Sequence, residues 1–487
     1  MSFGYRFLYL KTPLVAREIS HRKISSPKLM KIAIRFWQYC SYLALRLCEG
    51  LIGLLPLDGA FIIGKIGGEL MYRSLRKRRK MALANLRLAF GAEMSETQLH
   101  ALNRKHFQLL GANFLAGLKA STMPSEKIWE RVTTNIPEER PRIGWLALIS
   151  HLSCWELFSH LAERIPEYRF GAVYRRLYNP YLDRHLRKTR AKSGTTLFDR
   201  YDDLLKCVRF LREGGVVGIL IDQRAGRAGL WTPLFGRLAS SSTLAATLSI
   251  RTRAPVLPIA IETCGRARWK MIISDPVFPA EDEDTELFTA RINRLLEEMI
   301  RHSPADWLWA HNRWKPNRPA LLFTRDQRRR VFLPPDLDGT KLVPFRILIV
   351  SPNTRKAAAV TLAAVRAIQR GRPDAWLAAL TPVDFAEIWR DTSEVNQTIE
   401  FDSESAFALA SKIRRTAEFD AAIFFSPTWK TALAVWRAGI PIRVARRCGL
   451  MSVLFNLYPQ RPKDISDPIR LNLRLAKSIG ANIDGLP

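Results

Sequence analysis

The chain has 487 residues, enough for two or three domains, so the size of a hydrophobic core is no constraint. It carries 76 Lys and Arg against 45 Asp and Glu, a formal net charge of +31. Such a basic chain favours an anionic partner: nucleic acid, an acidic membrane surface or an acidic carrier. Nucleic acid is disfavoured, because the sequence has no zinc-finger spacing, RNA-binding aromatic signature or basic zipper.

The six cysteines are scattered and include no C-x-x-C pair, which predicts reduced thiols in a cytosolic setting and no disulfide framework or zinc site. They are Cys40, Cys48, Cys154, Cys207, Cys264 and Cys448. Cys154 stands between Ser153 and Trp155 and has no adjacent base of its own, which argues against a nucleophilic role.

The beginning of the chain suggests contact with a membrane. The first thirty residues are basic and aromatic without a cleavage site after a clean apolar core, so we expect no cleaved signal peptide. The run Phe36–Leu55 is apolar but contains Arg46 and Glu49, and a spanning helix needs about 20 apolar residues with few charges. We expect one or two amphipathic helices in the interface, ended by Pro56; an ordinary core helix is the alternative.

A dense basic run, Arg73–Lys80, follows and leads into the apolar segment Met81–Phe90. Basic charge beside an apolar face suits anionic headgroups, although a solvated helix face is possible. We therefore assign residues 1–90 to a membrane-associating region on the cytoplasmic side.

The next segment places a histidine between a strand and a helix. Trp145–Ile149 is predicted to be a buried strand, and helical spacing follows in Leu157, Phe158, Leu161 and Ala162. His151 lies at this junction, and Glu156 lies five residues later. A His can take the proton of an attacking alcohol while a carboxylate holds the ring. About one such pair is expected by chance in a chain this long, so a capping His with an unrelated Glu is the alternative.

Strands and helices alternate from Trp145 to about Glu262, which predicts an α/β layer fold. Apolar strands are expected at 214–221 and 254–261, with a helix at 242–252 between them. Asp222 directly follows the first of these strands, as His151 follows its own. Because reactive residues collect at the carboxyl ends of such strands, the two side chains could face one cleft.

Further along, the acids Glu281–Asp284 open a helix that is expected to reach Ile300. We place an α/β domain at 91–320, a Pro- and Arg-rich linker at 321–344, and a second α/β domain at 345–487, whose first strand is Phe345–Val350.

Several motifs occur in a characteristic order. They are Asn85-Leu86, His151-x4-Glu156, Tyr174-Arg175-Arg176-Leu177-Tyr178-Asn179-Pro180, Asp222-Gln223-Arg224, Pro233-Leu234-Phe235-Gly236 and the Trp-rich run Trp307–Lys315. This series, over roughly residues 30–320, resembles the bacterial lipid A secondary acyltransferases, the lauroyl and myristoyl transferase family. The resemblance implies a membrane-associated enzyme with a glycerolipid-acyltransferase-like α/β fold. It also implies transfer of a fatty acyl chain, usually from acyl carrier protein, to a hydroxyl of a lipid A precursor.

The resemblance also assigns roles to residues. It makes His151 the general base and Glu156 its partner, and it adds Arg175 and Asp222 to the catalytic set; the substrate-binding candidates are Asn179, Gln223, Arg224 and Arg313. Each role has an alternative. Arg175 either stabilises an oxyanion or binds a phosphate without a catalytic role. For Asp222 the alternative is a cap of the next turn, and for Arg313 it is closing the core with Trp307, Trp309 and Trp314. No metal or cofactor is implied, because a thioester is already activated. The sequence departs from the family pattern at Ser153-Cys154, where a Gly-Asn type pair is usual, and at Arg176, where Pro is common.

The region 345–487 resembles the amino-terminal half of the heptosyltransferase family of glycosyltransferases. The matching pieces are Arg346–Val350, Arg372–Ala375, Phe419–Phe424, Ala438–Arg443 and Asn472–Gly480. Arg355-Lys356 stands where that family has a Gly-Asp pair, so the acid that would serve as base is missing. The expectation is a noncatalytic, Rossmann-like half-domain that binds a sugar portion of the acceptor or a partner.

Together these observations predict an acyl carrier protein-dependent acyltransferase of a lipid A precursor on the cytoplasmic face of the inner membrane. Its expected partners are acyl carrier protein, the glycolipid acceptor and an anionic membrane surface, without nucleic acid. The alternatives are an acyltransferase of another glycolipid or a lysophospholipid, and a bifunctional or binding protein in which the C-terminal domain dominates.

Overall fold

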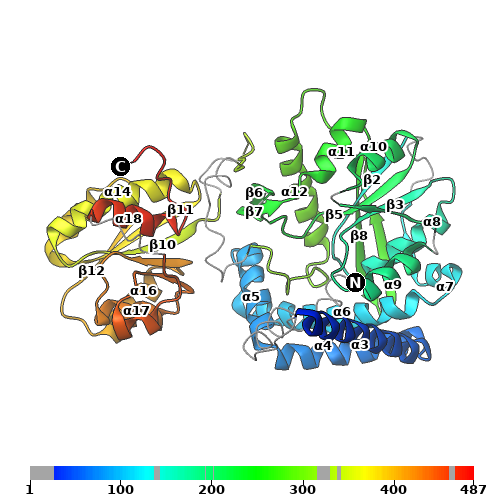
Figure 1. Ribbon diagram of the computed structural model, residues 1–487, viewed down its shortest axis with the longest axis horizontal. Helices are drawn as coiled ribbons and strands as arrows, with labels where there is room; N and C mark the ends of the chain where they lie inside the picture. The colour runs from blue at the N-terminus through cyan, green and yellow to red at the C-terminus, as the bar shows by residue number, and fades with distance from the viewer. Residues whose placement is uncertain are drawn as a thin grey trace. The chain divides into compact units, whose positions relative to one another are not determined.

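The computed structural model describes residues 27–136, 143–191, 194–200, 202–226, 228–314, 330–336, 342–459 and 467–486. The chain divides into two compact units, Met1–Gln223 with Ser241–His311, and Arg224–Ser240 with Asn312–Pro487 (Figure 1). Residues 1–26 of the N-terminal region, and 321–329 and 337–341 of the expected linker, lie outside the described residues.

The first unit is built on a seven-stranded sheet with the order β1-β9-β8-β2-β5-β3-β4. All neighbouring pairs are parallel except β8 and β9. The strands predicted at 145–149 and 214–221 appear as β2 and β5, and the strand predicted at 254–261 forms the first part of β8. The strands are β1 (Val132–Thr134), β2 (Trp145–Ile149), β3 (Phe170–Tyr174), β4 (Thr196–Asp199), β5 (Val216–Leu220), β8 (Val256–Gly265) and β9 (Arg268–Ile273).

Helices cover this sheet on both faces, so its central strands are apolar runs. One face packs against α6, and its core includes Ala112, Ala116, Trp145, Ile149 and Ile259. The helices of this unit are α3 (Pro27–Gly53), α4 (Leu57–Ser74), α5 (Arg76–Phe90), α6 (Glu96–Ala120), α7 (Ser125–Trp129), α8 (Leu161–Arg164), α9 (Pro180–Ala191), α10 (Leu204–Arg212), α11 (Leu244–Thr252) and α12 (Thr285–His302).

The apolar N-terminal run forms α3, and Pro56 separates it from α4, as predicted. No helix among the described residues is both long and apolar enough to cross a membrane. α4 packs closely on α6 because glycines meet at the crossing: a Cβ on Gly68 would lie 2.1 Å from the Phe107 carbonyl oxygen, and one on Gly64 2.3 Å from that of Gly111.

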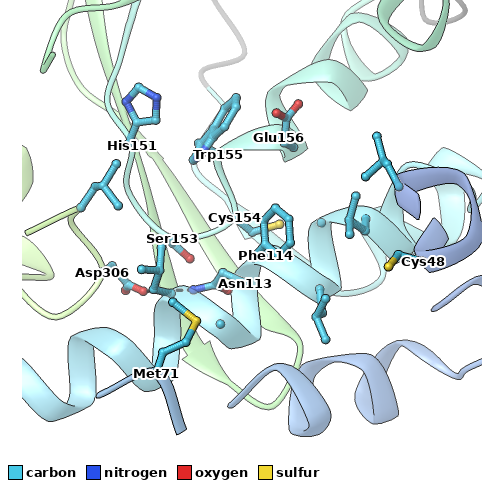
Figure 2. Close-up of a pocket in the computed structure, with 17 residues that line it drawn as sticks. Cys48, Met71, Asn113, Phe114, His151, Ser153, Cys154, Trp155, Glu156 and Asp306 are labelled. Atoms are coloured by element: carbon cyan, nitrogen blue, oxygen red, sulfur yellow. Dashed lines mark hydrogen bonds between the residues drawn. The ribbon is translucent and has the colours of Figure 1, made fainter. Parts of the chain in front are cut away.

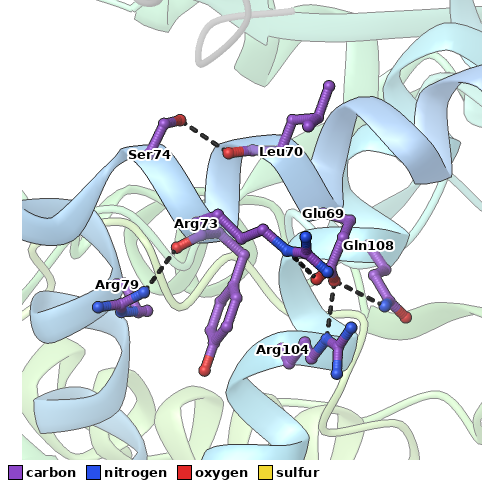
Figure 3. Close-up of polar contacts among 8 residues, drawn as sticks. Glu69, Leu70, Arg73, Ser74, Arg79, Arg104 and Gln108 are labelled. Carbon is purple, nitrogen blue, oxygen red and sulfur yellow. Dashed lines mark hydrogen bonds and ion pairs between the residues drawn. The ribbon is translucent and has the colours of Figure 1, made fainter.

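Polar contacts also join α4 to α6 (Figure 3). Glu69 accepts hydrogen bonds from Arg104 Nε at 2.8 Å, Gln108 Nε2 at 2.9 Å and Arg73 Nε at 2.9 Å. These bonds, that from Arg104 first, lower the pKa of the Glu69 carboxyl to about 2. These contacts fix the position of α4 relative to α6, and both helices contribute to the wall of the candidate site.

The second unit contains a five-stranded parallel sheet with the order β12-β11-β10-β13-β14. Its strands are β10 (Phe345–Val350), β11 (Ala375–Pro382), β12 (Gln397–Phe401), β13 (Ala421–Phe424) and β14 (Ile442–Val444). α14 (Arg355–Gly371), α15 (Ala386–Arg390) and α18 (Pro468–Lys477) pack on one face, while α16 (Ala406–Thr416), α17 (Trp429–Ala438) and the 3-10 helix η5 (Gly449–Leu454) pack on the other.

The short 3-10 helix η4 (Val383–Phe385) follows β11. The Pro233–Gly236 motif of the same unit lies in a hairpin of β6 (Leu230–Leu234) and β7 (Arg237–Ser241), where Phe235 and Gly236 both have positive φ. The prediction of a mixed α/β protein with parallel sheets is thus confirmed.

Candidate active site

Three of the predicted catalytic side chains follow neighbouring parallel strands of the first unit. His151 comes after β2, Asp222 after β5 and Arg175 after β3, and β5 lies between the other two strands. Because the carboxyl ends of parallel strands meet at one edge of a sheet, the fold gathers these residues there.

His151 and Asp222 form a buried pair at this edge. His151 Nδ1 lies 2.7 Å from Asp222 Oδ1, and both side chains are 3% exposed. Asp222 Oδ2 accepts hydrogen bonds from the His151 backbone N–H at 2.8 Å and from the Trp307 indole at 2.9 Å. Burial raises the pKa of the Asp222 carboxyl, but the His151 charge and these hydrogen bonds outweigh it and lower the pKa to about 2. Asp222 is therefore ionised and acts as an acceptor.

An ionised Asp222 orients the histidine ring. In the neutral imidazole, Nδ1 carries the proton that Asp222 accepts, and Nε2 then keeps its lone pair. Gln223 Nε2 lies 3.1 Å from His151 Nε2, and the Trp155 ring packs edge-on with its centroid 5.1 Å from that of the imidazole. The ring is held as a general base requires, with Nε2 as the basic atom.

Glu156, which the spacing predicted to hold the His151 ring, does not make that contact in the structure; Asp222 does. Glu156 is the second residue of the 3-10 helix η1 (Trp155–His160), and its Oε1 lies 3.4 Å from Arg190 Nη2 on α9. In Figure 2 the Trp155 side chain is drawn between His151 and Glu156. The physical reason is the tight turn after His151, which carries residue 156 away from the imidazole toward α9.

The other predicted residues have different surroundings. Arg175 is exposed at the end of β3. Asn179 is buried: its Oδ1 accepts from the backbone N–H groups of Tyr181 and Leu182 at the start of α9, and its Nδ2 donates to the Gln38 carbonyl oxygen at 2.7 Å. The Asn179 amide is thus used in capping and tethering helices, which favours a structural role over the predicted substrate contact.

Arg224 and Arg313 belong to the second unit. Arg224 is partly buried over the Trp231 ring, and burial lowers its pKa. Arg313 is completely buried and donates from Nη1 to the Ser240 carbonyl oxygen at 2.6 Å. The structure therefore corrects the prediction for Arg313, because its guanidinium lies in the core, away from any surface that a substrate could reach.

A largely apolar cavity of about 360 Å³ adjoins His151 (Figure 2). Its walls come from α3, α4, α6, the turn after β2 and the segment after α12; His151 lies in the wall, and most of the other lining side chains are apolar. The lining residues are Leu45, Cys48, Met71, Leu110, Gly111, Asn113, Phe114, Leu115, Gly117, Leu118, His151, Ser153, Cys154, Trp155, Glu156, Asp306 and Leu308. Such a cavity accommodates an unbranched apolar chain with its reactive end at the histidine.

Comparison with known proteins bears directly on this site. The family model for bacterial lipid A biosynthesis acyltransferases matches residues 30–316, more than half of the chain. The chain belongs to this family. It is also 26% identical to the lipid A biosynthesis lauroyltransferase of Escherichia coli (strain K12) over 281 residues, which cover 54% of this chain and 88% of that enzyme.

Among solved structures, the chain resembles the E. coli ADP-heptose lps heptosyltransferase II, with a TM-score of 0.26 and 23% identity. The match covers 29% of this chain and 44% of that chain, so less than half of the known structure is represented.

A polar network at the cavity floor was not predicted from the sequence. The Asp306 carboxylate accepts from Thr263 N at 2.9 Å, Thr263 Oγ1 at 2.7 Å and Ser303 Oγ at 2.6 Å, and its backbone carbonyl accepts from Ser153 N at 3.1 Å. Asn113 Nδ2 donates to Thr263 Oγ1 at 2.9 Å. The network ties the turn after β2 to β8 and α6. No local pattern reveals it, because its members are far apart in the sequence.

Ser153 has a φ of +50°, in the left-handed region that favours glycine. The Ser153 Oγ to Thr263 Oγ1 contact at 2.7 Å offsets part of the strain. We expect Ser153→Val to lower the free energy of unfolding by about 2–3 kcal/mol, from strain plus a lost hydrogen bond. Ser153→Gly should cost about 1 kcal/mol or less. Urea unfolding of both variants checks this, and equal losses would contradict it.

The cysteines give a second test of the site. Cys154 lines the cavity but is buried, and burial raises the pKa of its thiol well above the usual range. Burial likewise raises the pKa of Cys207 to about 12, whereas Cys48 and Cys264 are exposed. Brief N-ethylmaleimide treatment of the native protein should label Cys48 and Cys264 and leave Cys154 and Cys207 unlabelled by peptide mass spectrometry. Rapid labelling of Cys154 would mean that its thiol is accessible and that a nucleophilic role must be reconsidered.

Proposed function

We propose that this protein transfers a fatty acyl chain from acyl carrier protein to a hydroxyl of a lipid A precursor at the cytoplasmic face of the inner membrane. The observation that carries the proposal is the buried His151–Asp222 pair beside an apolar cavity, in a chain of the lipid A acyltransferase family. We also propose that residues 91–320 have a glycerolipid-acyltransferase-like fold.

In the proposed reaction, His151 Nε2 takes the proton of the acceptor hydroxyl while the hydroxyl oxygen attacks the thioester carbonyl carbon. The C–O ester bond forms and the C–S bond breaks. The imidazolium then returns its proton to the departing carrier thiolate, while Asp222 stabilises the ring's positive charge. Arg175, exposed at the same sheet edge, is proposed either to stabilise the oxyanion or to hold an acceptor phosphate. Gln223, next to Nε2, is proposed to contact the substrate.

The cavity is proposed to hold the acyl chain during transfer. Phe114 lines its wall and is drawn near Cys154 in Figure 2. Phe114→Ala should enlarge the cavity and raise the rate ratio of hexadecanoyl over dodecanoyl donors by roughly tenfold. The reason is that each additional methylene buried in an apolar pocket stabilises the bound transition state. Competition between the two carrier-protein thioesters measures this ratio. Phe278→Ala, at an exposed phenylalanine outside the cavity lining, is the matched control and should leave the ratio unchanged. An unchanged ratio in Phe114→Ala would argue that the chain lies elsewhere.

The exposed apolar face of α3 and α4 is proposed to lie in the membrane interface. Its exposed side chains are Ile32, Ile34, Phe36, Trp37, Tyr39, Leu43, Leu47, Leu51, Leu54, Ile62, Ile63, Ile66 and Leu70. Each such side chain contributes roughly 1.5–3 kcal/mol when fully removed from water, so partial immersion of several is enough to hold the protein at a bilayer. Leu45 and Cys48 of α3 and Met71 of α4 also line the cavity, so an acyl donor or lipid acceptor could reach His151 without leaving the interface.

The region 345–487 is proposed to be a noncatalytic, Rossmann-like half-domain. Its parallel strand order, with β10 in the centre, β11 and β12 added on one side and β13 and β14 on the other, supports this assignment. Arg355 and Lys356, at the start of α14, supply no carboxylate to act as a base. Binding of the sugar part of the acceptor, or of a partner, is the role we expect for it.

A panel of acceptors tests the proposed function. Purified full-length protein in mixed micelles would receive labelled acyl carrier protein thioesters together with a tetra-acylated lipid A precursor, a lysophospholipid or an unrelated glycolipid. We expect the acyl chain on the lipid A precursor alone, read by mass spectrometry, and a slower reaction with the coenzyme A thioester. Acylation confined to the lysophospholipid or the other glycolipid would overturn the acceptor assignment.

A further inference from the structure

One face of the second unit presents large apolar side chains to solvent. α17 packs beside both α16 and η5 in a layer that covers one face of the five-stranded sheet. The inner sides of these elements form a core, yet their outer sides are not polar. The exposed apolar residues are Phe407 (57%), Trp429 (56%), Trp436 (49%), Leu450 (84%) and Val453 (78%). We call this set the α17 surface.

The spacing of these residues along α17 and along η5 places them on one side of each helix. Trp429 and Trp436 stand at i and i+7 of α17, so they lie on the same side of the helix, and the partly buried Leu433 lies between them. Leu450 and Val453 are three residues apart in η5, where side chains at i and i+3 eclipse each other. Leu450 and Val453 are among the most exposed large apolar side chains in the described part of the chain.

The charge around the α17 surface has one sign. No Asp or Glu occurs between Asp420 and Asp464, a stretch that contains α17, β14 and η5. The described basic residues of this stretch are Lys430, Arg437, Arg443, Arg446 and Arg447. Arg446 donates to Asn472 of α18 on the other face of the sheet, and Arg443 donates to backbone carbonyl oxygens, so Lys430, Arg437 and Arg447 are the cations considered for the α17 surface. Arg437 stacks on the Phe407 ring at 4.2 Å, which places a cation against the apolar set. Just before the neighbouring α16, the acid Glu404 is paired with Lys412 of that helix at 3.1 Å.

We propose that the α17 surface is a second membrane-docking site, which binds the headgroup region of an anionic bilayer. Tryptophan and leucine beside arginine and lysine is the composition that inserts at an interface while cations meet acidic lipids. A second copy of this chain fits poorly, because a two-fold interface would bring two basic surfaces together. The inference rests on the second unit alone and does not depend on the acyltransfer mechanism.

Photo-crosslinking of the full chain tests this inference. The probe is a phosphatidylglycerol and phosphatidylethanolamine vesicle carrying a small fraction of diazirine-labelled phosphatidylglycerol, with crosslinked peptides mapped by mass spectrometry. We expect crosslinks both in α3–α4 and in the segments 429–436 and 449–454, and loss of the latter in phosphatidylcholine vesicles. Crosslinks on α3–α4 with none in 429–454 would overturn the inference, leave the proposed function standing and point to a protein partner for the α17 surface.

Two variants sharpen the test. Leu450→Asp with Val453→Asp should lower crosslinking at 429–454 by about tenfold, because two inserted apolar groups become charged, and should leave crosslinking at α3–α4 unchanged. Val383→Asp is the matched control, since Val383 is 51% exposed on η4, outside the α17 surface. Equal crosslinking of wild-type and doubly substituted protein at 429–454 would also contradict a membrane contact there.

Discussion

Asp222→Asn is expected to lower kcat for acyl transfer by about three to four orders of magnitude. An amide at this position cannot neutralise the imidazolium, and its N–H can force the other ring tautomer, which places the proton on the atom that should act as base. Substrate binding should change little, because Asp222 is buried behind the ring. Steady-state kinetics with varied donor and acceptor separates kcat from KM.

Glu156→Gln is the matched comparison to Asp222→Asn. Sequence spacing and geometry disagree on which of these two carboxylates contacts His151. The spacing made Glu156 the partner of His151, whereas the structure gives that contact to Asp222 and pairs Glu156 with Arg190. We expect Glu156→Gln to lower kcat by roughly tenfold to a hundredfold, less than Asp222→Asn, through a shifted η1 turn. The reverse ranking would mean that Glu156 moves onto the ring when substrate binds.

His151→Ala should abolish acyl transfer, with a loss of at least about 10³–10⁴-fold, because the proposed base is removed. The two carboxylates that also line the cavity are engaged elsewhere: Glu156 with Arg190, and Asp306 with Thr263 and Ser303. Vesicle binding should persist, since the apolar face of α3 and α4 is untouched. His160→Ala is the control for removing a buried histidine; its Nδ1 contacts Ser125 Oγ at 2.7 Å and its ring is absent from the cavity lining. Substantial transfer by His151→Ala would reject the proposed base.

Local patterns were enough to predict the elements that carry the site. The apolar runs before His151 and Asp222 became β2 and β5, and the acids at 281–284 were followed by α12, which Asp284 caps through its side chain. The rule that parallel strands gather reactive residues at their carboxyl ends was sufficient to expect His151 and Asp222 in one place, and they are hydrogen-bonded.

Local patterns could not decide which carboxylate touches the histidine. That choice depends on β5 being the neighbour of β2 in the sheet, and on the turn at Ser153 carrying Glu156 toward α9. The cavity was equally hidden, because its walls combine side chains of α3, α4 and α6 that are far apart in sequence. Arg313 shows the opposite failure: a charged residue in a family motif suggested substrate contact, yet tertiary packing buries it completely.

The most direct test of the central claim is the mass of a tetra-acylated lipid A precursor after incubation with wild-type protein and one equivalent of acyl carrier protein thioester. The account predicts that the precursor gains one acyl chain as the carrier thiol is released in equal amount. An unchanged precursor, or thiol released with free fatty acid as the sole acyl product, from protein that is folded and bound to the micelle, would contradict it.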